Sequence, residues 1–89
     1  MKRCLIDGNE IKSKAQLQDK LAYSLGFPEW YGGNFDAFHD CLSDIKEETV
    51  ITVINYSELS ANIGKNAQLL IKVICDCAKE NENIKLNKY

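Results

Sequence analysis

The sequence predicts an α/β fold, in which a three-stranded parallel sheet packs against helices in the order β-α-α-β-α-α-β. Short apolar runs at residues 2–7, 49–54 and 83–89 are separated by segments of helical periodicity. Parallel strands require such crossover connections, which are right-handed. The run TVITVI (residues 49–54) is nearly all apolar and β-branched, which is typical of a central strand buried on both faces. A chain of 89 residues favours one domain spanning residues 1–89.

The first strand and the first helix have clear boundaries in the sequence. The strand KRCLID (residues 2–7) ends at the turn signal Asp7-Gly8. Ser13 and Gln16 match the S-x-x-Q capping box that begins a helix, and Gly26 stands where a helix-ending glycine is expected. The predicted buried stripe of this helix consists of Leu17, Leu21 and Leu25.

The second helix is predicted to begin after Asn34, a good N-cap residue, and to be strongly amphipathic. At about 100° per residue, one side carries the apolar residues Phe35, Phe38, Cys41, Leu42 and Ile45. The opposite side carries Asp36, Asp40, Ser43 and Asp44, and His39 lies at the border. The polar side is therefore expected to face solvent.

The second half of the chain supplies the remaining elements. Residues 57–64 suggest a short helical turn ending at Gly64, and Asn66 is expected to cap a longer helix over residues 67–81. The predicted buried stripe of that helix is Leu70, Ile71, Ile74 and Cys77 or Ala78. Apolar and polar residues alternate weakly over residues 83–89, a pattern that favours an edge strand.

Composition and charge exclude several classes of function. No apolar run approaches the roughly 20 residues of a membrane span, and the N-terminal run is too short for a signal peptide, so a cytoplasmic location is expected. The net charge of −2 without a basic stripe disfavours direct nucleic-acid binding. The cysteines form no C-x₂-C pair, so neither a metal site nor another cofactor is expected. Reduced, buried or half-buried thiols are expected for Cys4, Cys41, Cys75 and Cys77, with Cys75 and Cys77 facing different directions.

The charges of the second helix need an explanation. Asp36, Asp40 and Asp44, which we call the acidic stripe, repeat at intervals of four, and like charges at this spacing destabilise a helix by roughly 0.2–0.5 kcal/mol per pair. A solvated face kept for solubility is one interpretation. The preceding loop favours another, because Trp30 and Tyr31 are typical interface anchors, although either could pack into the core. Together with the open backbone at the adjacent glycines, these residues indicate a patch for a basic partner.

The stretch around this patch resembles the signature of the barstar family, the bacterial intracellular ribonuclease inhibitors. The matching residues are Pro28, Glu29, Trp30, Tyr31, Gly32, Asn34, Asp36, Ala37, Asp40, Cys41 and Leu42. The similarity in length, in the Ile-x-Gly turn near the start and in the order of elements extends over the whole chain. The resemblance implies a barstar-like two-layer fold and a 1:1 complex with a small, basic, extracellular-type ribonuclease. By default, the free chain is expected to be a monomer.

In such a complex the second helix and its preceding loop fill the nuclease active site. The resemblance implies that the Asp40 carboxylate replaces a substrate phosphate, and that Asp36 makes a second acidic contact. The implied partner-binding set is Trp30, Tyr31, Gly32, Asn34, Asp36, His39, Asp40, Ser43 and Asp76. The chain departs from the family pattern at His39, where an aromatic residue is usual, and at Gly33, where an acidic residue is common. A protonated His39 would weaken the negative charge of the stripe.

Three other interpretations remain for comparison. Catalysis by Asp36, Asp40 and His39 is disfavoured, because these residues lie on one exposed helix without a predicted cleft. A metal site would need more converging ligands than one helix supplies. The main alternative is a protein of the same fold that regulates a partner other than a nuclease.

Overall fold

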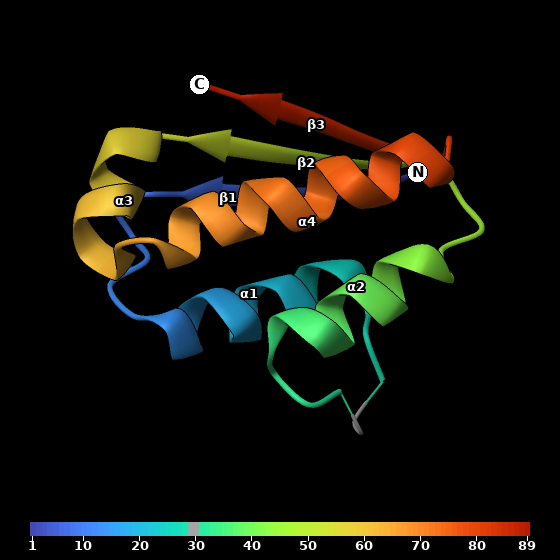
Figure 1. Cartoon of the computed structure of the whole chain (residues 1–89), viewed down its shortest axis with the longest axis horizontal. Helices are drawn as coiled ribbons and strands as arrows, with labels where there is room; N and C mark the ends of the chain where they lie inside the picture. The colour runs from blue at the N-terminus through green and yellow to red at the C-terminus, as the bar shows by residue number, and fades with distance from the viewer. Residues whose placement is uncertain (29–30) are drawn as a thin grey trace.

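The computed structural model describes residues 1–28 and 31–89. In chain order its elements are β1 (Lys2–Asp7), α1 (Lys14–Leu25), α2 (Phe35–Ser43), β2 (Thr49–Ile54), α3 (Tyr56–Ile63), α4 (Asn66–Glu80) and β3 (Ile84–Lys88) (Figure 1). The order β-α-α-β-α-α-β and the α/β class predicted from the sequence are confirmed.

The three strands form one parallel sheet in the order β1-β2-β3. Cys4 of β1 lies opposite Ile51 of β2, which in turn lies opposite Leu86 of β3. The predicted central position of residues 49–54 is therefore confirmed, and β3 is an edge strand as expected.

Only one face of the sheet is covered by helices (Figure 1). Along β1, Cys4 and Ile6 are buried whereas Leu5 between them is 50% exposed. Along β2, Ile51 and Val53 are buried whereas the alternate residues Val50, Thr52 and Ile54 are only half-buried. The expectation that residues 49–54 are buried on both faces was wrong, because the helices cover one face of the sheet. The two-layer fold implied by the barstar resemblance is confirmed.

The helix boundaries follow from local hydrogen bonds. Ser13 Oγ accepts from the Gln16 backbone N–H at 3.2 Å, and Leu17, Leu21 and Leu25 are buried as predicted. In a capping box the Gln16 side chain would accept from the backbone N–H of Ser13. Here Gln16 Oε1 instead accepts from the N–H of the preceding residue, Lys12, at 2.6 Å. The Ile-x-Gly turn after β1 has a steric cause: a Cβ on Gly8 would lie 2.0 Å from the Asn55 backbone oxygen.

Two details of the second half differ from expectation. Asn66 does not cap α4 but is its first residue, and its Nδ2 donates to the Ile63 carbonyl at the end of α3, at 3.1 Å. Leu70, Ile74 and Cys77 form the buried stripe of α4. Cys77 and Cys75 face different directions as predicted, but Cys75 is exposed rather than half-buried. All four cysteines are free thiols.

Candidate functional site: the acidic face of helix α2

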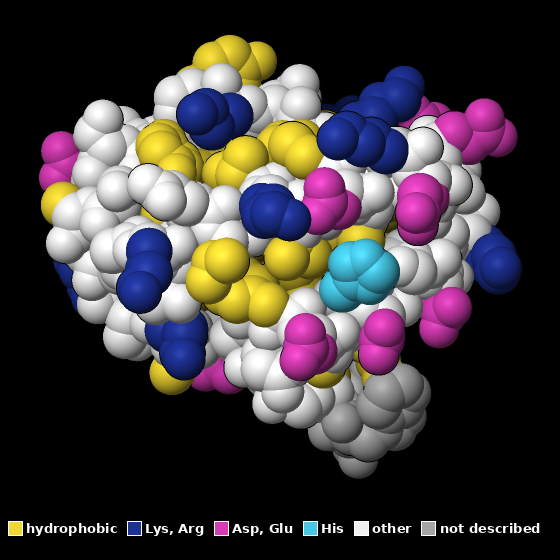
Figure 2. Space-filling model, in the orientation of Figure 1, with side chains coloured by type: hydrophobic (Ala, Val, Ile, Leu, Met, Phe, Trp, Pro, Cys, Tyr) yellow, Lys and Arg dark blue, Asp and Glu magenta, His cyan; other side chains and the backbone are white. Residues whose placement is uncertain are grey.

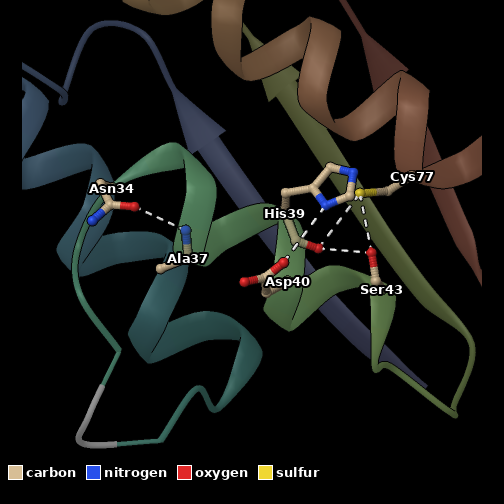
Figure 3. Close-up of polar contacts among 6 residues, drawn as sticks. All are labelled: Asn34, Ala37, His39, Asp40, Ser43 and Cys77. Carbon is tan, nitrogen blue, oxygen red and sulfur yellow. Dashed lines mark hydrogen bonds and ion pairs between the residues drawn. The ribbon is translucent and has the colours of Figure 1, made fainter.

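The helix α2 presents its acidic stripe because its ends and its apolar side are fixed. Asn34 Oδ1 accepts from the Ala37 backbone N–H at 2.8 Å, which confirms the predicted N-cap (Figure 3). Phe38 and Leu42 are fully buried. The three aspartates of the acidic stripe are exposed, so the predicted amphipathic arrangement is confirmed. The helix is thus anchored on one side and charged on the other.

The acidic stripe is not neutralised by the chain's own cations. The side chain of Asp40 is 87% exposed, and His39 Nδ1 lies 4.0 Å from Asp40 Oδ1. Among the described residues, no lysine or arginine nitrogen lies within 4.0 Å of a carboxylate oxygen of Asp36, Asp40 or Asp44. Figure 2 shows acidic side chains close to His39 on this face of the molecule. The stripe is therefore free to attract positive charge from outside.

His39 and Ser43 lie where α2 packs against α4 (Figure 3). Ser43 Oγ donates to the His39 carbonyl at 2.8 Å, and Cys77 Sγ of α4 lies 3.8 Å from the same oxygen. Burial raises the pKa of the Cys77 thiol, and a hydrogen bond with Ser43 offsets part of that rise. The Ser43 hydroxyl thus helps to join the two helices, while the His39 side chain, 45% exposed, remains accessible.

Asp76 of α4 differs from the acidic stripe because it has a partner of its own. Lys72 Nζ lies 3.1 Å from Asp76 Oδ2, with the two side chains 71% and 45% exposed. Lys72 was not among the residues singled out from the sequence, although its i,i+4 spacing from Asp76 indicates such a pair. In the free protein Asp76 is therefore paired with a lysine of its own helix.

The loop before α2 is tied to α1 by Tyr31. The Tyr31 hydroxyl donates to Gln18 Oε1, and its ring centroid lies 4.9 Å from that of Phe27. Gly32 and Gly33 beyond it are exposed, and Gly33 has φ +67°, a left-handed conformation that favours glycine over the acidic residue common in the family. Trp30 and Glu29 lie outside the described residues.

Burial of Tyr31 has a measurable consequence. Desolvation, with a smaller contribution from Cys41, raises the pKa of Tyr31 to about 12. Because the neutral phenol is favoured in the folded state, this stabilisation is complete below the unfolded pKa of about 10 and is lost as pH rises towards 12. We expect a late step in the ultraviolet phenolate titration that Tyr31→Phe abolishes; a titration unchanged by this substitution would contradict the burial of Tyr31.

A residue that sequence analysis missed holds the other end of α2. Asn81, directly after α4, donates from Nδ2 to the carbonyls of Ile45 and Leu42 at 3.0 and 3.3 Å. These bonds satisfy carbonyl groups at and just beyond the end of α2. Asparagine at a helix end is common, and only the tertiary arrangement shows what this one binds.

The described residues contain no group of three or more His, Cys, Asp or Glu side chains that could hold a metal ion. In the same part of the chain, none of the helices has the length and apolar character needed to span a bilayer.

Comparison with known proteins agrees with this description. A family model described as Barstar (barnase inhibitor) matches residues 1–87. The chain belongs to the barstar family. It is also 32% identical over 81 residues to the "Putative ribonuclease inhibitor YrdF" of Bacillus subtilis (strain 168), an alignment that covers 90% of this chain and 89% of that protein.

The barstar signature lies on one continuous segment, the loop before α2 and α2 itself. Asp36 and Asp40 are free charges on its surface, whereas Asn34 and Ser43 use their side chains to fix the helix. Tyr31 fixes the loop. Among the residues selected from the barstar resemblance, the structure thus distinguishes the exposed carboxylates of Asp36 and Asp40 from Tyr31, Asn34 and Ser43, which position them.

Proposed function

We propose that this member of the barstar family inhibits a small, basic ribonuclease in a 1:1 complex, with α2 and its preceding loop filling the active site. The observation that carries the proposal is the Asp40 carboxylate, which stands 87% exposed in the middle of the stripe and has no lysine or arginine nitrogen within 4.0 Å among the described residues. In the complex this carboxylate occupies the place of an RNA phosphate. Arginine and lysine side chains that bind phosphate also bind carboxylate through charge-assisted hydrogen bonds.

The rigidity of α2 supports this role. Aspartate has a short side chain, so its carboxylate position is set by the helix backbone, and that backbone is fixed by Asn34 at one end and Asn81 at the other. A binding group that is already ordered loses little conformational entropy when a partner arrives. The mutual repulsion along the stripe is also relieved when positive charge approaches.

The charge of the stripe further favours rapid and selective association. A negative patch facing a positive cleft accelerates encounter and disfavours partners of the wrong charge. The effect is screened by salt, with a Debye length of about 8 Å at physiological ionic strength. A nuclease toxic to its own cell requires rapid capture, and we place the protein in the cytoplasm, as a monomer, where its four free thiols stay reduced.

The test is a titration of small basic bacterial ribonucleases with the purified protein, with RNA cleavage as the readout. We expect cleavage by at least one enzyme to fall linearly to zero at one equivalent. Absence of inhibition across such a set, together with tight binding to a basic protein that is not a nuclease, would favour the alternative of a regulator with the same fold.

The ion pair on α4 gives a second prediction for inhibition. Lys72 competes with the nuclease for Asp76, so Lys72→Gln frees this carboxylate and removes a positive charge facing a positive enzyme. We expect inhibition to tighten by about twofold at low salt, since an exposed i,i+4 pair contributes about 0.3–0.5 kcal/mol. Measured inhibition constants provide the check.

Lys79→Gln is the matched control, because Lys79 is an exposed lysine of the same helix. Lys79→Gln changes the net charge by the same amount as Lys72→Gln. A difference in inhibition between the two variants is therefore attributed to the ion pair. Equal effects of the two substitutions would show that Asp76 makes no contact with the nuclease.

A further inference from the structure

A second concave surface lies between α1 and the loop that leads to α2. It is a hollow of about 320 Å³, which we call the α1 hollow, with Asp19 and Tyr23 of α1 on one side and Phe27, Tyr31 and Gly33 of the loop on the other. This volume is at the lower end of the range for small-ligand pockets and suits one long side chain.

The lining of the α1 hollow favours a cation. Among the described residues that line it, Asp19 is the one with a charged side chain, and three aromatic residues, Tyr23, Phe27 and Tyr31, accompany it. Tyr23 is 88% exposed, so its ring is open to solvent and to a partner. Aromatic faces attract ammonium and guanidinium groups within about 6 Å, and a carboxylate adds its own attraction.

Gln18, at the wall of the hollow, has unused hydrogen-bonding capacity. Only 4% of the residue is exposed, and its Nε2 has no partner among the described residues. A half-turn of the amide lets Nε2 donate to the Tyr31 oxygen, while the Tyr31 hydroxyl donates to the Asn34 carbonyl, 3.4 Å away. That orientation leaves Oε1 as the free atom, and an acceptor is the kind of group that an arginine side chain, which only donates hydrogen bonds, requires.

We propose that the α1 hollow is a subsite for an arginine side chain of the bound ribonuclease. This inference rests on the proposed function. The loop residues Tyr31 and Gly33 line the hollow and lead directly to Asn34, the cap of α2, so the hollow continues the acidic face. Arginine fits better than lysine, because its planar group stacks on rings while donating two parallel hydrogen bonds to a carboxylate.

The experiment measures inhibition of a basic ribonuclease that the parent protein blocks, using Asp19→Asn, Tyr23→Ala and the double variant. We expect Tyr23→Ala to weaken inhibition by roughly 2- to 30-fold, the range of one cation–π contact. We expect Asp19→Asn to weaken inhibition by a similar factor, through loss of the attraction between carboxylate and guanidinium. Glu58→Gln and Tyr89→Ala are matched controls, because they alter an exposed carboxylate of α3 and an exposed C-terminal ring. We expect both controls to inhibit as the parent does.

A nuclease-free measurement accompanies the titration. N-acetyl-arginine amide is added to the isotopically labelled protein, and backbone amide shifts are followed by nuclear magnetic resonance. We expect shifts centred on Asp19 and Tyr31 that Asp19→Asn removes, in addition to any shifts on α2.

The outcomes separate the two proposals. The subsite is overturned, and the proposed function left intact, if the parent protein inhibits and the variants inhibit equally well. The same holds if the parent protein inhibits but N-acetyl-arginine amide causes no amide shifts around the hollow. A parent protein that inhibits no ribonuclease overturns both, since the occupant is then not a nuclease arginine. Weakened inhibition by the variants, with unchanged controls, supports the subsite.

Discussion

Asp40→Ala is expected to weaken ribonuclease inhibition by at least about 30-fold while leaving the protein folded. Removing one member of a desolvated, hydrogen-bonded charge pair costs about 2 kcal/mol or more, because the positive groups of the nuclease remain buried without a partner. In the free protein the Asp40 side chain is 87% exposed, so its removal leaves no cavity. Inhibition constants, together with thermal unfolding of the variant, measure the two effects separately.

Asp44→Ala is the matched control within the same acidic stripe. Asp44 is exposed one turn beyond Asp40 and is the C-cap residue of α2, where the helix dipole disfavours negative charge. We expect a change of a few-fold at most, through the loss of long-range attraction. If Asp40→Ala and Asp44→Ala weaken inhibition equally, the stripe acts by total charge, and Asp40 does not replace a phosphate.

Asp40→Asn separates charge from shape at the same position. Asparagine is nearly isosteric with aspartate, yet it accepts hydrogen bonds with one oxygen and has no charge. If Asp40 replaces a phosphate, Asp40→Asn should weaken inhibition nearly as much as Asp40→Ala does. Retention of inhibition by Asp40→Asn would indicate that shape, rather than charge, determines recognition.

The fold could be predicted wherever a local pattern determines it. The stripe of Leu17, Leu21 and Leu25 and the cap at Asn34 depend on residues close in sequence, and both were found as predicted. The error for residues 49–54 has a different origin. A run of β-branched residues is equally compatible with one covered face and with two, and only the number of helices available decides between them.

The site was predictable to the same degree. The exposure of Asp36 and Asp40 follows from helical periodicity, so the sequence placed the charges on the correct side of α2. Their supports were not predictable, because Asn81 reaches the end of α2 across 36 residues or more, and the Gln18 amide meets Tyr31 across 13. At Asn66 a local pattern gave the wrong prediction. Asparagine is a good N-cap residue, but the side chain of Asn66 donates a hydrogen bond to the end of the preceding helix, α3.

Phe38→Ala is expected to lower the stability of the fold while leaving inhibition by the folded protein unchanged. This is the reverse of the effect expected for Asp40→Ala, although the two residues lie on the same turn of α2. Phe38 is fully buried, with its ring centroid 6.0 Å from that of Phe27 and 6.4 Å from that of Phe35. Truncation of a buried phenylalanine costs about 3–5 kcal/mol. This is a large share of the roughly 5–15 kcal/mol that stabilises a typical domain, so the unfolding free energy should fall sharply in urea denaturation.

The same variant keeps every carboxylate of the acidic stripe. Its folded fraction therefore binds the nuclease normally, and added ribonuclease draws the unfolded fraction into the complex by mass action. At low temperature we expect RNA cleavage to reach zero at one equivalent of the variant. The apparent affinity should be reduced only in proportion to the unfolded fraction. Phe38→Leu, which retains most of the buried volume, should lose less stability and inhibit like the parent. A Phe38→Ala protein that is folded but does not inhibit would show that the buried side of α2 contributes to recognition, and that the helix is more than a rigid support for its charges.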